Sequence, residues 1–280
     1  MRTVGVIGAG TMGSGIAETA AAVSQVILLD VDLERAEAGL MAIEKRLSRQ
    51  VEKGYIDAAR KGELLDRIRV SVDLRELSDA DLVVEAAAEK LDVKREIFRS
   101  LGEICSPQCI LGTNTSALSV TALAASTREP QRVVGIHFFN PVTRMKLVEL
   151  VSTPFTSSAC LERCRKFVDA LDKVAVVVEE APGFIVNRLL IPMINEAAFL
   201  LAEGTASAED IDTAMRLGAN HPMGPLALAD LIGLDICLAI METLHNELGE
   251  DKYRPAPLLR KMVRAGQLGR KSGAGFYKYN

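Results

Sequence analysis

Long apolar runs are missing from this sequence of 280 residues. No stretch approaches the ~20 apolar residues that a membrane helix needs. The N-terminus also lacks the basic segment, apolar core and cleavage site of a secretory leader, because a glycine turn interrupts the first apolar run. Excess positive charge is missing as well, since the formal net charge is −4. Nothing therefore draws the whole chain to nucleic acid or to an anionic membrane, and we expect it to bind neither.

Cysteine and histidine are scarce. The five cysteines are an odd number, and without a secretory leader they predict reduced thiols in a cytoplasmic protein. The three histidines, His137, His221 and His245, lie far apart. None of them follows Cys160 and Cys164 at the spacing of a zinc finger. We expect buried thiols and no metal site.

The first thirty residues carry the strongest pattern in the chain. The apolar run 3–7 predicts a β-strand, and a glycine-rich turn follows it immediately. A stretch of small residues over 14–22 is compatible with a helix, and residues 25–29 predict a second buried strand that ends at Asp30. The bare glycine pattern also occurs in unrelated α/β turns, but strand, turn, helix, strand and acid together predict a dinucleotide-binding unit.

Each residue of this turn has a physical role in holding a dinucleotide. Gly8 permits the tight turn, Gly10 leaves room for the pyrophosphate, and Gly13 lets the helix pack close to the sheet. The helix start offers N–H groups and a positive dipole end to the phosphates. Asp30 is suited to accept hydrogen bonds from the ribose hydroxyls, and its charge would repel a 2′-phosphate. NAD is therefore favoured over NADP, although Arg35 lies close in sequence.

Strands and helices continue to alternate up to about residue 180. Residues 33–67 predict a long helical segment, broken into two helices near Gly54. The alternation predicts an α/β fold with a Rossmann-type, doubly wound, mainly parallel sheet. Further strands are expected over 68–72, 81–85, 108–113, 133–137, 145–151 and 174–178, and further helices over 92–105, 117–125 and 157–171.

Strand signals stop from Pro182 onward. Helices are expected over 184–203, 207–217 and 226–248, with a connector around 251–257. Pro182 suits a helix start, because its missing N–H has no partner there in any helix. We predict a Rossmann-type domain over 1–181 and a smaller all-helical domain over 182–280. The apolar faces of a helical domain this small favour burial against a second copy, and hence a homodimer.

Two residues depart from their local patterns in a way that suggests chemistry. His137 closes a predicted strand, and ligands of open α/β sheets bind at the carboxyl ends of strands. A histidine satisfied by neighbouring groups at a strand end is the alternative. Glu149 falls among apolar residues of its strand, where a carboxylate is unfavourable unless it is paired. We predict that Glu149 pairs with a histidine and fixes its tautomer.

Ser116 and Asn187 are weaker candidates. Ser116 follows the strand over 108–113 at the edge predicted to face the cofactor, but a serine there can simply cap the next helix. Asn187 comes early in the helix after Pro182, where it can bond to backbone or water instead. The residues alone thus indicate a nucleotide site and a His–Glu pair without naming a substrate.

Seven motifs together resemble the 3-hydroxyacyl-CoA dehydrogenase family, and in particular its short bacterial members. The resemblance covers essentially the whole chain. The motifs are Gly8-Ala-Gly-Thr-Met-Gly13, Val84-Glu-Ala-Ala-Ala-Glu89, Thr113-Asn-Thr-Ser116, His137-Phe-Phe-Asn-Pro141, Pro182-Gly-Phe-Ile-Val-Asn-Arg188, His221-Pro-Met-Gly-Pro225 and Gly273-Ala-Gly-Phe-Tyr277.

The resemblance implies reversible hydride transfer between NAD and the C3 carbon of an acyl-CoA, with (S)-3-hydroxybutyryl-CoA and acetoacetyl-CoA as the expected pair. It implies that His137 is the general acid and base and that Glu149 orients its ring. Ser116 and Asn187 are then expected to hydrogen-bond the C3 oxygen. With Asn187 on the helical domain and His137 on the other, we expect the site to form when a cleft closes.

The resemblance also implies contacts to the two coenzymes. Basic residues cluster on the helix around residues 45–53, where the family's coenzyme A contacts align most nearly with Arg46 and Lys53. A solvated charged face is the alternative interpretation of these charges. The residues expected to bind NAD are Gly8, Ala9, Gly10, Thr11, Met12, Gly13, Asp30, Glu89, Lys94, Asn114, Ser116 and Asn140.

Two other functions remain to be weighed. One is a dehydrogenase of a sugar acid or another 3-hydroxy acid without coenzyme A, of the gulonate type. The other is a non-catalytic NAD-binding protein that kept the fold and lost turnover. The basic helix and the short chain favour an acyl-CoA substrate, and the intact set Ser116, His137, Glu149 and Asn187 favours an enzyme.

Overall fold

A computed structural model describes residues 1–279 of the chain. It divides into two compact units, of which the first covers Met1–Glu180 and the second begins at Ala181. Within the described part of the chain, no helix has the length and apolar character that crossing a membrane requires. All five cysteines are buried and unbridged, as the sequence predicts.

The first unit is built on one eight-stranded sheet with the strand order β3-β2-β1-β4-β5-β6-β7-β8. β1 to β6 run parallel, β7 is antiparallel to β6, and β8 is parallel to β7. The predicted Rossmann-type, mainly parallel sheet is therefore confirmed. The strands are β1 Thr3–Ile7, β2 Gln25–Leu29, β3 Ile68–Ser71, β4 Leu82–Glu85, β5 Ile110–Thr113, β6 Val133–Phe138, β7 Leu147–Ser152 and β8 Val174–Glu179.

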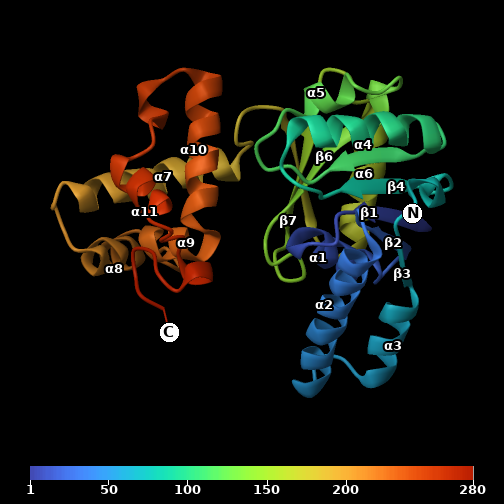
Figure 1. Ribbon diagram of the computed structural model, residues 1–280, viewed down its shortest axis with the longest axis horizontal. Helices are drawn as coiled ribbons and strands as arrows, with labels where there is room; N and C mark the ends of the chain where they lie inside the picture. The colour runs from blue at the N-terminus through green and yellow to red at the C-terminus, as the bar shows by residue number, and fades with distance from the viewer. Residues whose placement is uncertain (280) are drawn as a thin grey trace. The chain divides into compact units, whose positions relative to one another are not determined.

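Helices cover both faces of this sheet, because strands buried on both sides need apolar partners above and below. A single apolar core joins α1, α2 and α6 to one face. Figure 1 shows α4 and α5 together above the sheet and α1 and α2 below it. The helices are α1 Thr11–Ala20, α2 Leu33–Glu52, α3 Ala58–Asp66, α4 Leu91–Ile104, α5 Val120–Ala124 and α6 Ser158–Ala170, with short 3-10 turns η1 Leu74–Leu77 and η2 Pro130–Arg132.

The segment after Asp30 forms a helical hairpin, α2 and α3, that extends beyond the sheet (Figure 1). The predicted break near Gly54 is confirmed, and Gly54 has a φ of 71°. Asp32 and Asp57 cap the two helices by accepting hydrogen bonds from the backbone N–H groups of Arg35 and Arg60. The hairpin thus follows from local signals, namely two acidic caps and one glycine in the left-handed region.

The second unit is helical in its described residues apart from two isolated β-bridges near the C-terminus. The expectation of one helix over 226–248 is wrong, because Gly233 adopts a φ of 108° and divides it into α9 and α10. The expected connector around 251–257 leads into a further helix, α11, whose Leu259 and Met262 are buried. The elements are α7 Val186–Ala202, α8 Ala208–Gly218, α9 Pro225–Ile232, α10 Leu234–Leu248, η3 Asp251–Tyr253, α11 Pro257–Arg264 and η4 Arg270–Ser272.

A buried carboxylate on α9 fastens the C-terminal segment to this unit. Asp230 is only 1% exposed. It accepts hydrogen bonds from the backbone N–H groups of Phe276 and Tyr277 and from the hydroxyl of Tyr279, each at 2.9 Å. A buried charge is tolerated when several donors surround it in this way.

We predict that Asp230→Ala lowers the free energy of unfolding by roughly 3 kcal/mol, because it leaves two half-buried N–H groups and the Tyr279 hydroxyl without their acceptor. The matched control is Asp235→Ala. The half-exposed carboxylate of Asp235 pairs with Lys271 of the same C-terminal segment. That variant should lose less than about 1 kcal/mol. Urea unfolding followed by far-ultraviolet circular dichroism compares the two. Equal losses would show that Asp230 does not fasten the segment.

Candidate active site

The glycine turn between β1 and α1 has the shape that a dinucleotide requires. Gly8 has a φ of 97°, and its N–H donates to the Leu29 carbonyl at 2.7 Å. A Cβ on Gly13 would lie 1.6 Å from the Gly8 carbonyl oxygen, so only glycine lets α1 start this close to the strand. At Gly10, by contrast, a Cβ would meet no atom within 4 Å. The backbone at Gly10 therefore borders open space rather than protein.

Asp30 stands at the end of β2 beside this turn. Its Oδ2 accepts a hydrogen bond from the Ala9 N–H at 2.7 Å, and its Oδ1 accepts one from the Val31 N–H at 2.8 Å. These bonds fix the carboxylate at the wall of a cavity of about 470 Å³. The cavity is lined by Ala9, Gly10, Thr11, Ser14, Asp30, Arg35, Ala38, Gly39, Ala42 and Arg46. The open space, the helix start and the carboxylate fit the pyrophosphate and ribose of NAD.

Arg46, which the family resemblance aligned with a coenzyme A contact, lies in the wall of this cavity. Its Nε donates to the buried Glu18 of α1 at 2.6 Å, and Gln50 donates to the same carboxylate at 3.1 Å. Burial raises the pKa of Glu18, and the hydrogen bond from Arg46 works in the opposite direction. Lys53 is exposed at the end of α2. The two basic residues thus have different surroundings, and only Lys53 projects into solvent without a buried acid beside it.

Gly39 is a residue of this site that the sequence analysis missed. A Cβ there would lie 2.6 Å from the Cβ of Ala9, so glycine allows α2 to lie against the glycine turn. The signal in the sequence was weak, because a lone glycine inside a helical pattern has no specific meaning.

A network of charged groups occupies the carboxyl ends of β4 and β5. Glu89 follows β4, and its Oε1 accepts hydrogen bonds from the Ser116 N–H at 3.0 Å and from the Thr115 hydroxyl. Lys94 of α4 lies 3.3 Å from the other oxygen of Glu89. Lys94 is buried, and its ammonium also binds Glu85. Three of the predicted site residues, Glu89, Lys94 and Ser116, are therefore brought together in one unit.

The two asparagines predicted to bind the cofactor lie beside neighbouring strands. Asn114 follows β5, and its side-chain oxygen accepts a hydrogen bond from the Phe138 N–H at 2.9 Å, which ties β5 to the end of β6. Asn140 is exposed in the turn after β6. Both residues therefore border the end of the strand that carries His137.

His137 and Glu149 face one another across β6 and β7. They are directly opposite in the antiparallel register, and the His137 Nδ1 lies 2.8 Å from the Glu149 Oε2. Both residues are buried, at 5% and 0% exposure. The ring of Phe139 lies 4.5 Å from the imidazole, centroid to centroid. With Nδ1 on the carboxylate, Nε2 is the other ring nitrogen at which a proton can be exchanged.

The turn that connects these two strands is held by a lysine that the sequence analysis missed. Lys173 is buried, and its ammonium donates to the carbonyls of Val142 and Met145 at 2.6 and 2.7 Å. Burial lowers the pKa of this ammonium. Val142 also lies against α1, because a Cβ added to Gly15 would come within 3.0 Å of the Val142 side chain. Lys173 therefore fixes the turn against the dinucleotide-binding helix.

The remaining predicted residue, Asn187, lies in the first turn of α7 in the second unit. Among the described residues, no group of three or more histidine, cysteine, aspartate or glutamate side chains is arranged to hold a metal ion.

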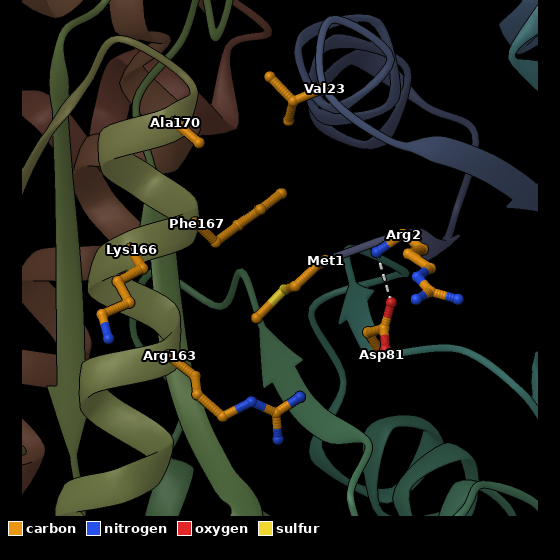
Figure 2. Close-up of a pocket in the computed structure, with 8 residues that line it drawn as sticks. All are labelled: Met1, Arg2, Val23, Asp81, Arg163, Lys166, Phe167 and Ala170. Atoms are coloured by element: carbon orange, nitrogen blue, oxygen red, sulfur yellow. Dashed lines mark hydrogen bonds between the residues drawn. The ribbon is translucent and has the colours of Figure 1, made fainter.

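A second cavity, of about 430 Å³, lies at the opposite edge of the sheet, where the strands begin (Figure 2). Figure 2 shows Arg163 and Lys166 of α6 on one side and Asp81 bonded to the backbone of Arg2 on the other. None of the predicted site residues lines this cavity.

A dinucleotide cavity and a buried histidine–carboxylate pair at the carboxyl ends of one parallel sheet define a nucleotide-dependent dehydrogenase. Comparison with family models identifies the family more closely than the geometry does. Residues 3–181 match the NAD-binding domain of 3-hydroxyacyl-CoA dehydrogenase, and residues 183–279 match its C-terminal domain. The chain belongs to the 3-hydroxyacyl-CoA dehydrogenase family and is an oxidoreductase.

Individual relatives are similar to this chain over nearly their whole lengths. A probable 3-hydroxybutyryl-CoA dehydrogenase of Bacillus subtilis is 52% identical over 280 residues, covering 100% of this chain and 98% of the relative. A 3-hydroxybutyryl-CoA dehydrogenase of Clostridioides difficile is 50% identical, with 98% of each chain covered. The crystal structure of (S)-3-hydroxybutyryl-CoA dehydrogenase from Ralstonia eutropha superposes with a TM-score of 0.96 at 46% identity, covering 100% of this chain and 99% of that one.

We predict that Gly10→Ala keeps the fold but weakens NADH binding about tenfold or more, because the new methyl group enters the open space at the turn. Gly13→Ala is the contrasting variant, since its methyl group would collide with protein backbone and disturb the turn itself. Cofactor fluorescence titration gives Kd, and thermal unfolding gives Tm. An unchanged Kd for Gly10→Ala at native Tm would contradict the assignment of this space to the cofactor.

Proposed function

We propose that this chain catalyses the reversible, NAD-dependent oxidation of (S)-3-hydroxybutyryl-CoA to acetoacetyl-CoA. The observation that carries the proposal is the buried pair of His137 and Glu149 at the carboxyl edge of a dinucleotide-binding sheet. The printed names of relatives that are about 50% identical over the whole chain support the four-carbon acyl-CoA. The fold alone would leave the substrate open, because one fold hosts many reactions.

In the oxidative direction, the His137 Nε2 takes the proton of the C3 hydroxyl as a hydride leaves C3. The nicotinamide ring of bound NAD supplies the hydride acceptor and, when reduced, the hydride donor. In the reverse direction, the His137 imidazolium returns the proton to the C3 oxygen. Glu149 holds the ring by its Nδ1 and offsets the positive charge of the imidazolium, so one residue can act as acid and as base.

Hydrogen-bond donors to the C3 oxygen complete the proposed mechanism. Ser116 is suited to this role, because Glu89 fixes its backbone at the edge of the sheet. Asn187 keeps the role that the family motif implies, as a second donor to the same oxygen. Donors of this kind typically contribute about 3 kcal/mol each in a site from which water is excluded.

Asp30 supports NAD rather than NADP as the cofactor. Its carboxylate is fixed at the cavity wall, where its charge would oppose a 2′-phosphate. The two arginines of the same wall are partly neutralised, since Arg46 is bonded to Glu18 and Arg35 lies 3.4 Å from Asp32. The other proposed cofactor contacts are those of the glycine turn, Glu89, Lys94, Asn114, Ser116 and Asn140.

Coenzyme A is proposed to meet the basic hairpin α2–α3, with Lys53 as the better placed of the two candidates. Lys53 is exposed, whereas the Arg46 guanidinium is already engaged by Glu18. The proposed partner of the protein is a second copy of itself through the helical unit. Large apolar side chains exposed on that unit support this, namely Ile185, Leu189, Leu217, Leu231 and Ile236. Unbridged cysteines support a reducing compartment such as the cytoplasm.

The test of the proposed function is turnover of acetoacetyl-CoA with NADH, followed by the absorbance of the reduced cofactor. We expect turnover of the CoA ester and none of the free acid. Activity restricted to free sugar acids would identify a gulonate-type dehydrogenase instead. NADH binding without turnover of any of these compounds would identify a non-catalytic binding protein.

We predict that His137→Gln lowers kcat by roughly 100- to 10,000-fold, because it removes the group that carries the proton. The Kd for NADH should stay close to that of the unsubstituted protein, since the glycine turn is not touched. His245→Gln, on α10, is the control and should keep its kcat. Near-normal kcat for His137→Gln would refute the assignment of the general base.

We predict that Asp30→Ala weakens NAD binding more than NADP binding. The substitution removes hydrogen-bond acceptors for the ribose hydroxyls and, at the same time, the charge that opposes a 2′-phosphate. The ratio of the two Kd values, measured by fluorescence titration with the reduced cofactors, reports the change. Equal weakening of both would show that Asp30 does not select the cofactor.

A further inference from the structure

Glu85 is a fully buried carboxylate at the carboxyl end of β4, and the mechanism above does not use it. Its exposure is 0%. It accepts hydrogen bonds from the Ala87 N–H at 2.6 Å, from the Thr113 hydroxyl at 2.7 Å and from the Lys94 ammonium at 2.7 and 2.9 Å. The donors come from the loop after β4, from β5 and from α4. Glu85 is therefore the point at which these three segments meet.

Lys94 is equally buried, with a side-chain exposure of 1%. Its ammonium contacts both oxygens of Glu85, the Ala87 carbonyl at 3.3 Å and the Glu89 carboxylate at 3.3 Å. Replacing a buried ion pair by apolar side chains is often neutral or stabilising. The stability of the unit alone therefore does not account for charges gathered at this place. What the ion pair provides is a fixed position for the ammonium.

Glu89 is the exposed end of this series, with 42% of its side chain accessible. A glutamate that is exposed to this extent occupies several rotamers unless something holds it. Lys94 holds one oxygen, and the other accepts hydrogen bonds from the Ser116 N–H at 3.0 Å and from the Thr115 hydroxyl. The contact between Glu89 and the Ser116 hydroxyl, at 3.5 Å, is too long to dictate the direction of the hydroxyl hydrogen. Glu89 thus fixes the backbone of Ser116 through the Ser116 N–H.

We propose that Glu85 is a positioning residue that sets the place of Ser116 through Lys94 and Glu89. Glu85 fixes the ammonium of Lys94, the ammonium fixes the carboxylate of Glu89, and that carboxylate fixes the Ser116 backbone at the edge where the C3 oxygen is handled. The proposal rests on the proposed function for the role of Ser116. The order of the contacts, from the buried to the exposed group, gives Glu85 no direct part in the chemistry.

The first experiment uses Glu85→Gln, which keeps the shape of the side chain and removes its charge. Loss of the ion pair lets Lys94 and Glu89 move. We expect kcat for acetoacetyl-CoA reduction to fall about tenfold, equivalent to about 1.4 kcal/mol, because Ser116 is displaced rather than removed. In a Ser116→Ala background the same substitution should change kcat less than twofold, because the group being positioned is gone. Equal effects in both backgrounds would overturn the proposal.

A second measurement does not depend on activity. The Ser116 N–H donates to Glu89, so its backbone hydrogen exchange reports whether Glu89 is held in place. In Glu85→Gln we expect exchange in the segment 114–118 to accelerate about tenfold while β1 and β6 keep their protection. General destabilisation would instead accelerate exchange throughout the sheet. Unchanged exchange in segment 114–118 would contradict the proposal even if kcat fell.

The matched control is Asp81→Asn, which makes the same kind of change at the other end of β4. Asp81 accepts hydrogen bonds from the backbone N–H groups of Arg2 and Thr3 at the edge of the sheet shown in Figure 2. Asp81→Asn should leave kcat and the hydrogen exchange of segment 114–118 unchanged. If Glu85→Gln does not reach a native Tm, Thr113→Val removes one hydrogen bond to Glu85, together with the acceptor of the Thr115 N–H, and kcat is then the readout, with a smaller decrease expected. A native kcat for Thr113→Val would then count against the proposal.

The two proposals fail in distinguishable ways. Absence of acetoacetyl-CoA turnover in the unsubstituted protein removes the proposed function, and the exchange measurement still tests the link from Glu85 to Ser116. Turnover in the unsubstituted protein together with native kcat in Glu85→Gln removes the positioning role alone.

Discussion

The hydrogen bond between the His137 Nδ1 and the Glu149 carboxylate is the interaction on which the rest of the site depends. It exists because β7 runs antiparallel to β6, which sets the two residues directly opposite one another. All strands before β7 are parallel, and parallel neighbours require a crossover connection rather than a turn. The chain therefore reverses in the connection 139–146, shortly after His137. Lys173 holds the reversing turn by two carbonyls, so the register of the pair is fixed from both sides.

The parallel sheet also explains where charges are found. Both faces of β1, β4 and β5 are covered, so a charged side chain can reach a functional surface only at the end of a strand. Asp30, Glu85 and His137 all occupy such positions. Each is bonded to donors or acceptors that the fold supplies, because an unpaired charge at this depth would be unfavourable. The carboxyl edge thus concentrates the charged groups from which the proposed site is built.

Local signals made much of this fold predictable. The glycine turn, the acid after the second strand and the break at Gly54 are written in consecutive residues, and the structure follows them. The division of 226–248 was not foreseen, because a single glycine in an apolar run does not reveal that its φ is positive. The further helix α11 begins at Pro257, the last residue of the predicted connector, where a proline is suited to be the first residue of a helix.

The site was predictable to a different degree. The pairing of His137 with Glu149 followed from a carboxylate on an apolar strand, which had to find a partner. Glu85 stood inside a recognised motif, but its link to Lys94 and Glu89 depends on three segments that only the folded chain brings together. Arg46 was likewise not predictable, because its bond to Glu18, a buried acid of another helix, is not evident from the charged helix that carries it. Pairs across distant segments are decided by tertiary packing, and a single sequence does not contain that information.

The central claim is that a ring held at Nδ1 carries the proton at Nε2. It is tested most directly by a crystal structure of the protein with acetoacetyl-CoA and NAD. The His137 Nε2 is expected to lie about 3 Å from the C3 oxygen, within hydrogen-bond reach, while Nδ1 stays on Glu149. A ring turned so that Nε2 faces away from the C3 oxygen, with no water linking the two, would contradict it.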